Sequence, residues 1–84
     1  MTYPVIDMKA TGNRIRQIRI GNKMRVSDIS DYMGFEYAQA VYKWEAGKSL
    51  PSVDNLYALS RLFGVSVEDI LVEANRDDEF EKAV

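Results

Sequence analysis

The chain is 84 residues long, enough for one small domain with a single hydrophobic core, and 46% hydrophobic and 29% charged residues are typical of a globular protein. It contains no cysteine and no histidine, which excludes disulfide bonds and zinc–thiolate sites and removes the commonest general base and metal ligand. We therefore expect no enzymatic activity, no metal and no cofactor.

The net charge of −2 is unevenly distributed along the chain. From Lys9 to Lys48 eight basic residues stand against four acidic ones, a surplus of +4, whereas residues 49–84 hold three basic and eight acidic residues, a net −5. A positive N-terminal half suits a surface that contacts phosphates. This indication is weak alone, because basic helix faces are common.

The first ten residues are predicted to form an N-terminal arm (1–10). Its apolar residues alternate along the chain: Tyr3, Val5, Ile6 and Met8. The arm is expected to be extended and either loosely packed or paired with a partner chain, and a frayed terminus is the simpler alternative. Pro4 and Asp7 interrupt it, so it is not a signal peptide, and no apolar run reaches membrane-spanning length. We expect a cytoplasmic protein without membrane contact.

The main domain is predicted over residues 11–74 and begins with two helices. Thr11 is a suitable N-cap for the first helix, and Ile15 and Ile18 form its apolar stripe. This helix is expected to end around residues 21–23. The second helix, 26–33, buries two apolar residues four positions apart and ends at Gly34, in a left-handed conformation.

The third helix is predicted over residues 38–46, with Gly47 as its stop. Val41 and Trp44 are three residues apart and share an inward face. Gln39 and Lys43 point outward, where they suit the reading of base edges in a DNA major groove. For an isolated helix, a solvated polar surface is the simpler interpretation.

Two further helices complete the domain. Ser52 is the predicted N-cap of a fourth helix that ends at Gly64, and Ser66 that of a fifth. The expected buried faces comprise Val53, Leu56, Leu59, Leu62 and Phe63 in the fourth helix, and Val67, Ile70 and Leu71 in the fifth. An acidic C-terminal tail follows (75–84). The fold class is all-α, a compact five-helix domain.

Ordered motifs along the chain resemble those of the Cro/repressor-type (XRE) helix-turn-helix family. They are I-R-Q-I-R, Met24 nine positions after Ile15, I-S-D-Y-M-G, V-Y-K-W-E-A-G-K, P-S-V-D-N-L and L-F-G-V-S-V-E-D-I-L. The resemblance covers residues 12–72. It implies the lambda-repressor-like DNA-binding fold, in which the third helix enters the major groove and the second crosses the backbone.

The resemblance places four residues at base-facing positions of the third helix: Ala38, Gln39, Tyr42 and Lys43. Gln39 suits a bidentate bond to adenine, and Lys43 suits either guanine O6 and N7 or a phosphate. Tyr42 packs on a thymine methyl or a sugar, or only covers the surface. Ala38 offers a methyl group.

Other residues are assigned supporting roles by the same resemblance. Arg19 and Glu45 are expected to form a salt bridge that orients the third helix. Phosphate contacts are expected from a basic and polar set: Arg14, Arg16, Arg25, Lys48 and Ser49.

The chain also departs from the family pattern. The turn F-E-Y after Gly34 is one residue longer than usual, which puts contacts by Tyr37 and Ala38 in doubt. In the family the second helix usually begins with Ser or Thr followed by Gln. Arg25 and Val26 occupy these two positions here. The glycine common at the end of the first helix is Lys23.

These features predict a sequence-specific DNA-binding transcription regulator, a repressor that occupies an operator as a homodimer. Since the chain has no room for a separate effector domain, occupancy is the expected mechanism. The DNA is expected to be a double-stranded inverted repeat. Dimer contacts are expected from the arm and from Leu71, Val72 and Phe80. The alternative is an antitoxin that binds a toxin partner through the N-terminal arm or C-terminal tail and regulates its own operon.

Overall fold

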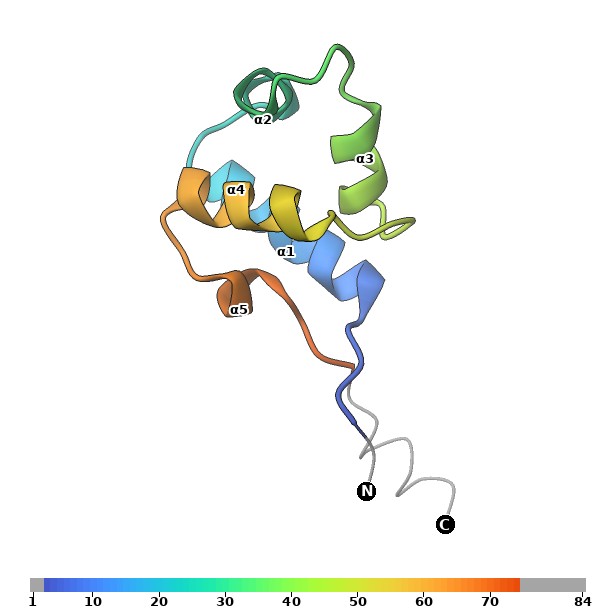
Figure 1. Ribbon diagram of the computed structural model, residues 1–84. Helices are drawn as coiled ribbons and strands as arrows, with labels where there is room; N and C mark the ends of the chain where they lie inside the picture. The colour runs from blue at the N-terminus through green and yellow to red at the C-terminus, as the bar shows by residue number, and fades with distance from the viewer. Residues whose placement is uncertain (1–2, 75–84) are drawn as a thin grey trace.

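The computed structural model describes residues 3–74, which fold into an all-α domain (Figure 1). Its helices are α1 (Met8–Gly21), α2 (Val26–Met33), α3 (Gln39–Glu45), α4 (Val53–Phe63) and α5 (Val67–Ile70). The predicted five-helix class is confirmed. In the described part of the chain no helix is long and apolar enough to cross a membrane.

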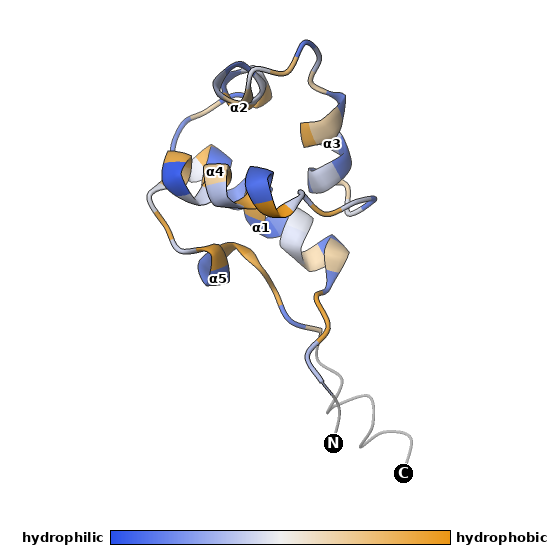
Figure 2. Ribbon diagram, viewed as in Figure 1, coloured by the Kyte–Doolittle hydropathy of each residue, from blue (hydrophilic) through white to orange (hydrophobic). Residues whose placement is uncertain are grey.

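A single core lies between the helices, and every helix contributes to it. The buried hydrophobic residues are Ile15, Ile29, Val41, Trp44, Leu59, Phe63 and Ile70. Figure 2 shows hydrophobic residues alternating with polar ones along each of the longer helices, as expected for helices with one buried face. α1 packs most extensively against α3, so α1 holds α3 in position.

The first helix begins earlier than predicted. Asp7, not Thr11, is its N-cap, and the Asp7 carboxylate accepts the N–H of Ala10 at 2.9 Å. Asp7 is itself a strong capping residue, and its extended backbone ends the arm there. Thr11 is fully buried in the second turn, and its hydroxyl accepts the N–H of Val72 at 2.9 Å.

Residues 5–7 pair with their own chain, so at these residues the segment is neither a frayed terminus nor free to pair with a partner chain. The N–H of Asp7 donates to the carbonyl of Val72, and the N–H of Ala74 donates to that of Val5, both at 2.8 Å. An antiparallel bridge joins Ile6 to Glu73. The two segments run together below α1 and α5 (Figure 1), and this pairing satisfies backbone groups that the sequence pattern left open.

The last two helices have the predicted serine caps. The Ser52 hydroxyl accepts the N–H of Asn55 at 3.2 Å, and the Ser66 hydroxyl accepts that of Asp69 at 3.0 Å. The prediction that Val53 is buried is wrong, because its side chain is 83% exposed. It lies in the first turn of α4, at the edge of the core, where Pro51 is buried instead.

Helices α1 to α4 all end with one residue of positive φ. In each case the N–H that follows this residue donates to a carbonyl five positions earlier, at 2.9–3.1 Å. Three of the four residues are glycines (Gly34, Gly47 and Gly64), as predicted for Gly34, and the fourth is Lys23, with φ of 58°. A left-handed backbone conformation costs a lysine free energy, because its Cβ comes close to a carbonyl oxygen. Glycine has no Cβ and adopts this conformation without that cost.

Lys23→Gly is therefore expected to raise the free energy of unfolding by about 1 kcal/mol, through relief of backbone strain. Urea unfolding followed by Trp44 fluorescence measures it. Arg16→Gly is the control, because Arg16 is exposed inside α1, where glycine costs about 1 kcal/mol. If Lys23→Gly leaves the midpoint unchanged or lowers it, the backbone at residue 23 is not strained.

Candidate nucleic-acid interface

The third helix has one buried face and one exposed face, as predicted. Val41 is fully buried and Trp44 is 4% exposed. The Trp44 ring makes an edge-to-face contact with Phe35, with 5.9 Å between ring centroids. Gln39 and Lys43 are exposed on the other face, and Tyr42 is 60% exposed. The buried pair fixes the rotation of the helix, so the three polar side chains are presented together.

The long turn before α3 keeps Ala38 outside the helix. The predicted span of 38–46 is one residue too long at each end, because α3 begins at Gln39 and ends at Glu45. Ala38 occupies the N-cap position without a side-chain hydrogen bond and is half-buried. Within the turn, Phe35 packs inward on Trp44, whereas Tyr37 is 66% exposed. Gln39 is thus the first base-facing candidate inside α3.

Two glycines let α1 and the end of α3 approach closely. A Cβ on Gly12 would lie 2.1 Å from the carbonyl oxygen of Trp44, and a Cβ on Gly47 would lie 2.7 Å from Cα of Lys9. No expectation from the sequence included this contact at Gly12. The available signal was a glycine close to the apolar stripe of a helix, which is costly unless packing requires it.

Arg19 and Glu45 form the ion pair that the family resemblance implied. Arg19 Nε lies 2.7 Å from Glu45 Oε2, and Nη2 lies 3.0 Å from Oε1. The third nitrogen, Nη1, donates to the carbonyl of Met24 at 3.1 Å. The two side chains are 13% and 9% exposed. The hydrogen bond to Glu45 raises the pKa of Arg19 above its ordinary value, so the guanidinium stays charged and connects α1 with α3.

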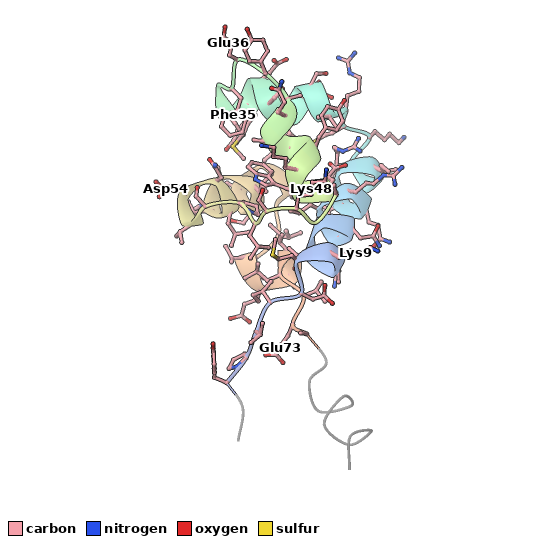
Figure 3. The ribbon with its side chains drawn as sticks, turned by 90° about the vertical axis from the view of Figure 1, so that its right-hand side faces the viewer. Lys9, Phe35, Glu36, Lys48, Asp54 and Glu73 are labelled. Atoms are coloured by element: carbon pink, nitrogen blue, oxygen red, sulfur yellow. The ribbon has the colours of Figure 1, made fainter. Side chains whose placement is uncertain are left out.

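The predicted phosphate-contacting residues lie at the surface. Arg14, Arg16, Arg25 and Lys48 are exposed, and Ser49 is half-buried. In Figure 3 nitrogen-tipped side chains project from α1 and the start of α2 along one edge of the molecule, and Lys48 lies nearer the centre of the view. Exposed basic side chains of this kind are suited to contacting phosphates.

The first turn of α2 has an acidic cap in place of the usual one. The N–H of Arg25 donates to Oδ2 of Asp28 at 2.7 Å, and the Arg25 guanidinium lies 3.5 Å from Oδ1. The hydrogen bond from the backbone N–H of Arg25 is the main reason why the pKa of Asp28 lies below its ordinary value. Asp28 thus replaces part of the missing cap, while the Arg25 side chain remains 82% exposed.

Within residues 3–74 no three carboxylate, histidine or cysteine side chains come together as a metal site. A small depression lies beside α1 and the end of α3, lined by Asp7, Lys9, Ala10, Asn13, Glu45 and Ala46. Glu45 is already engaged there with Arg19.

Comparison with known proteins agrees with this geometry. A family model described as "Helix-turn-helix" matches residues 15–70. The HTH-type transcriptional activator BcrR of Enterococcus faecalis is 26% identical over 58 residues, which are 69% of this chain and 28% of that protein. This chain thus spans about a quarter of that relative's length.

Two solved structures show the same fold. The restriction-modification controller protein C.AhdI from Aeromonas hydrophila superposes with a TM-score of 0.69 at 19% identity, over 76% of this chain and 96% of that one. The DNA-binding domain of BldD gives 0.66 at 24% identity, over 79% and 94%. The chain belongs to the helix-turn-helix family of DNA-binding transcription regulators, of the Cro/repressor (XRE) type.

Proposed function

We propose that the protein is a sequence-specific repressor that occupies its operator as a homodimer, with α3 in the major groove. The observation that carries the proposal is the exposed polar face of α3, held by the buried pair Val41 and Trp44. A helix of this diameter fits the major groove, where each base pair presents a distinct set of donors and acceptors.

Two residues of α3 are proposed to specify sequence. Gln39 lies in the first turn, has both a donor and an acceptor, and suits a bidentate bond to adenine. Lys43 follows one turn later on the same exposed face and suits guanine O6 and N7, or a phosphate at the groove edge. Tyr42 is proposed as an apolar contact to a thymine methyl or a sugar, whereas Ala38, half-buried at the N-cap, offers only its methyl group.

A single copy of α3 reads only a few base pairs, so useful specificity requires two copies. Two-fold symmetry would place the half-sites about one helical turn apart. We propose that the dimer contact involves α5 and the segment after it, where Leu71 and Val72 are half-buried on their own chain. Phe80, the third predicted contact, lies outside the described residues.

Selection of bound sequences from random double-stranded DNA with the purified protein tests the proposal. We expect enrichment of an inverted repeat with half-site centres about 10 base pairs apart. Absence of any enrichment at low salt would overturn sequence-specific binding. Co-purification of a second small protein, together with a weak DNA preference, would instead favour the antitoxin alternative, whose acidic segment (75–84) lies outside the described residues.

Lys48 provides a separate test of the phosphate contacts. Lys48→Ala is expected to weaken DNA binding about fivefold to tenfold near 0.1 M salt, equally for unrelated sequences, because one phosphate contact is lost. Fluorescence anisotropy with the selected duplex and a scrambled duplex measures both affinities. A loss confined to the selected duplex would show that Lys48 reads bases instead.

A further inference from the structure

Lys23 occupies a backbone position that this chain otherwise gives to glycine. The left-handed residues that end α2, α3 and α4 are all glycines, with φ of 70–74°, and only Lys23, after α1, carries a side chain among the described residues. The hydrogen bonds at the C-terminal end of α1 involve backbone atoms here. The Lys23 N–H donates to the carbonyl of Ile20, and the Met24 N–H donates to the carbonyl of Arg19. The fold therefore requires the left-handed conformation at residue 23 but not the lysine side chain.

The Lys23 side chain has no carboxylate partner within residues 3–74. The residue is exposed, and the ion pairs of this part of the chain join Arg19 to Glu45 and Arg25 to Asp28. A lysine in a strained backbone thus contributes no ion pair to the described structure. Backbone strain that local contacts do not compensate is characteristic of functional positions.

The position of Lys23 indicates what its ammonium group binds. It lies between α1 and the first turn of α2, two residues before the exposed Arg25. Nitrogen-tipped side chains from these elements share one edge of the molecule (Figure 3). In helix-turn-helix complexes the helix before the recognition helix crosses the DNA backbone, so the chain just before α2 lies near phosphates.

We propose that Lys23 binds a phosphate of the DNA backbone, an inference that rests on the proposed DNA-binding function. An ammonium group contacts a phosphate as a point charge and needs no fixed orientation, which suits a flexible side chain at an exposed turn. The contact adds affinity for all sequences and carries no base information. The protein thereby gives up folding stability at residue 23 and gains affinity for DNA.

Three substitutions separate the charge of Lys23 from its backbone strain. Lys23→Gly removes both, Lys23→Gln removes only the charge, and Lys23→Arg keeps both. A matched control is Arg61→Gln, which removes a charge from the exposed face of α4, where Arg61 contacts Tyr57. Each full-length variant is titrated onto a fluorescein-labelled mixed-sequence DNA duplex at several KCl concentrations, and its thermal midpoint is recorded.

Lys23→Gly is expected to melt at a higher temperature than the wild type and yet bind the duplex about fivefold to tenfold more weakly near 0.1 M salt. The slope of log affinity against log salt should fall by about one for Lys23→Gly and Lys23→Gln and stay unchanged for Lys23→Arg and Arg61→Gln. If the wild type binds and the slope is unchanged in the glycine and glutamine variants, Lys23 does not contact phosphate. If the wild type itself binds no duplex, the proposed function fails as well.

Discussion

Gly12→Ala is expected to destabilise the domain by about 3 kcal/mol or more, because the added methyl group would overlap the backbone of α3. The added Cβ would lie 2.1 Å from the carbonyl oxygen of Trp44 and 2.9 Å from that of Glu45. Both obstacles are backbone atoms, so no side-chain rotation relieves the overlap. α1 and α3 would have to separate, which opens the core around Trp44.

Urea unfolding followed by the fluorescence of Trp44, the one tryptophan of the chain, measures this loss. Gly21→Ala is the matched control in the same helix, because nothing lies within 4 Å of a Cβ at Gly21. It should stabilise α1 by up to about 1 kcal/mol through higher helix propensity. A Gly12→Ala protein as stable as the wild type would contradict the close crossing of α1 and α3.

Removal of either partner of the Arg19–Glu45 pair is expected to cost about 3 kcal/mol, because the remaining charge is left mostly buried and unpaired. The side chains are 13% and 9% exposed, so water cannot replace the lost partner fully. The double replacement Arg19→Met/Glu45→Leu leaves no unpaired charge and should be tolerated far better than either single change. It still loses the hydrogen bond to the Met24 carbonyl, at about 1 kcal/mol.

A double-mutant cycle of unfolding free energies, from urea titrations of the four proteins, measures the coupling. The expected pattern is two unstable single variants and a nearly normal double variant. Two harmless single variants would show that the Arg19–Glu45 pair does not stabilise the domain. The double variant also separates stability from function: if the pair orients α3, the double variant should fold and yet bind DNA less tightly.

The sequence predicted most of the fold because its helix ends carry clear local signals. Ser52 and Ser66 cap the last two helices as expected, and Gly34 and Gly47 have positive φ at the ends of α2 and α3. The spacing of apolar residues identified the inward face of α3, since Val41 and Trp44 are three positions apart and are both buried.

The errors arose where distant segments meet. The pairing of residues 5–7 with residues 72–74 joins the two ends of the domain, and no local pattern reveals it. This pairing brings Val72 onto the hydroxyl of Thr11, which then serves a tertiary contact, while Asp7 caps α1. Gly12 was missed for the same reason, because its role depends on the backbone of α3 and not on its neighbours in sequence.

The candidate site was predicted in its residue types but not in its contacts with DNA. Gln39, Tyr42 and Lys43 are exposed together as expected, whereas Ala38 is left outside α3 by the long turn. Which base each side chain contacts depends on how the domain sits in the groove, and an isolated domain does not determine this position. These contacts remain predictions.

Selection from random DNA with Gln39→Ala tests most directly whether the exposed face of α3 reads base pairs. The Gln39→Ala variant is expected to enrich an inverted repeat that has lost its base preference at one position in each half-site, where a bidentate contact is worth about 1–3 kcal/mol. Lys48→Ala, selected in parallel, should bind more weakly and enrich the unchanged repeat. If Gln39→Ala and Lys43→Ala both enrich the wild-type sequence with undiminished preference at every position, α3 does not read the DNA.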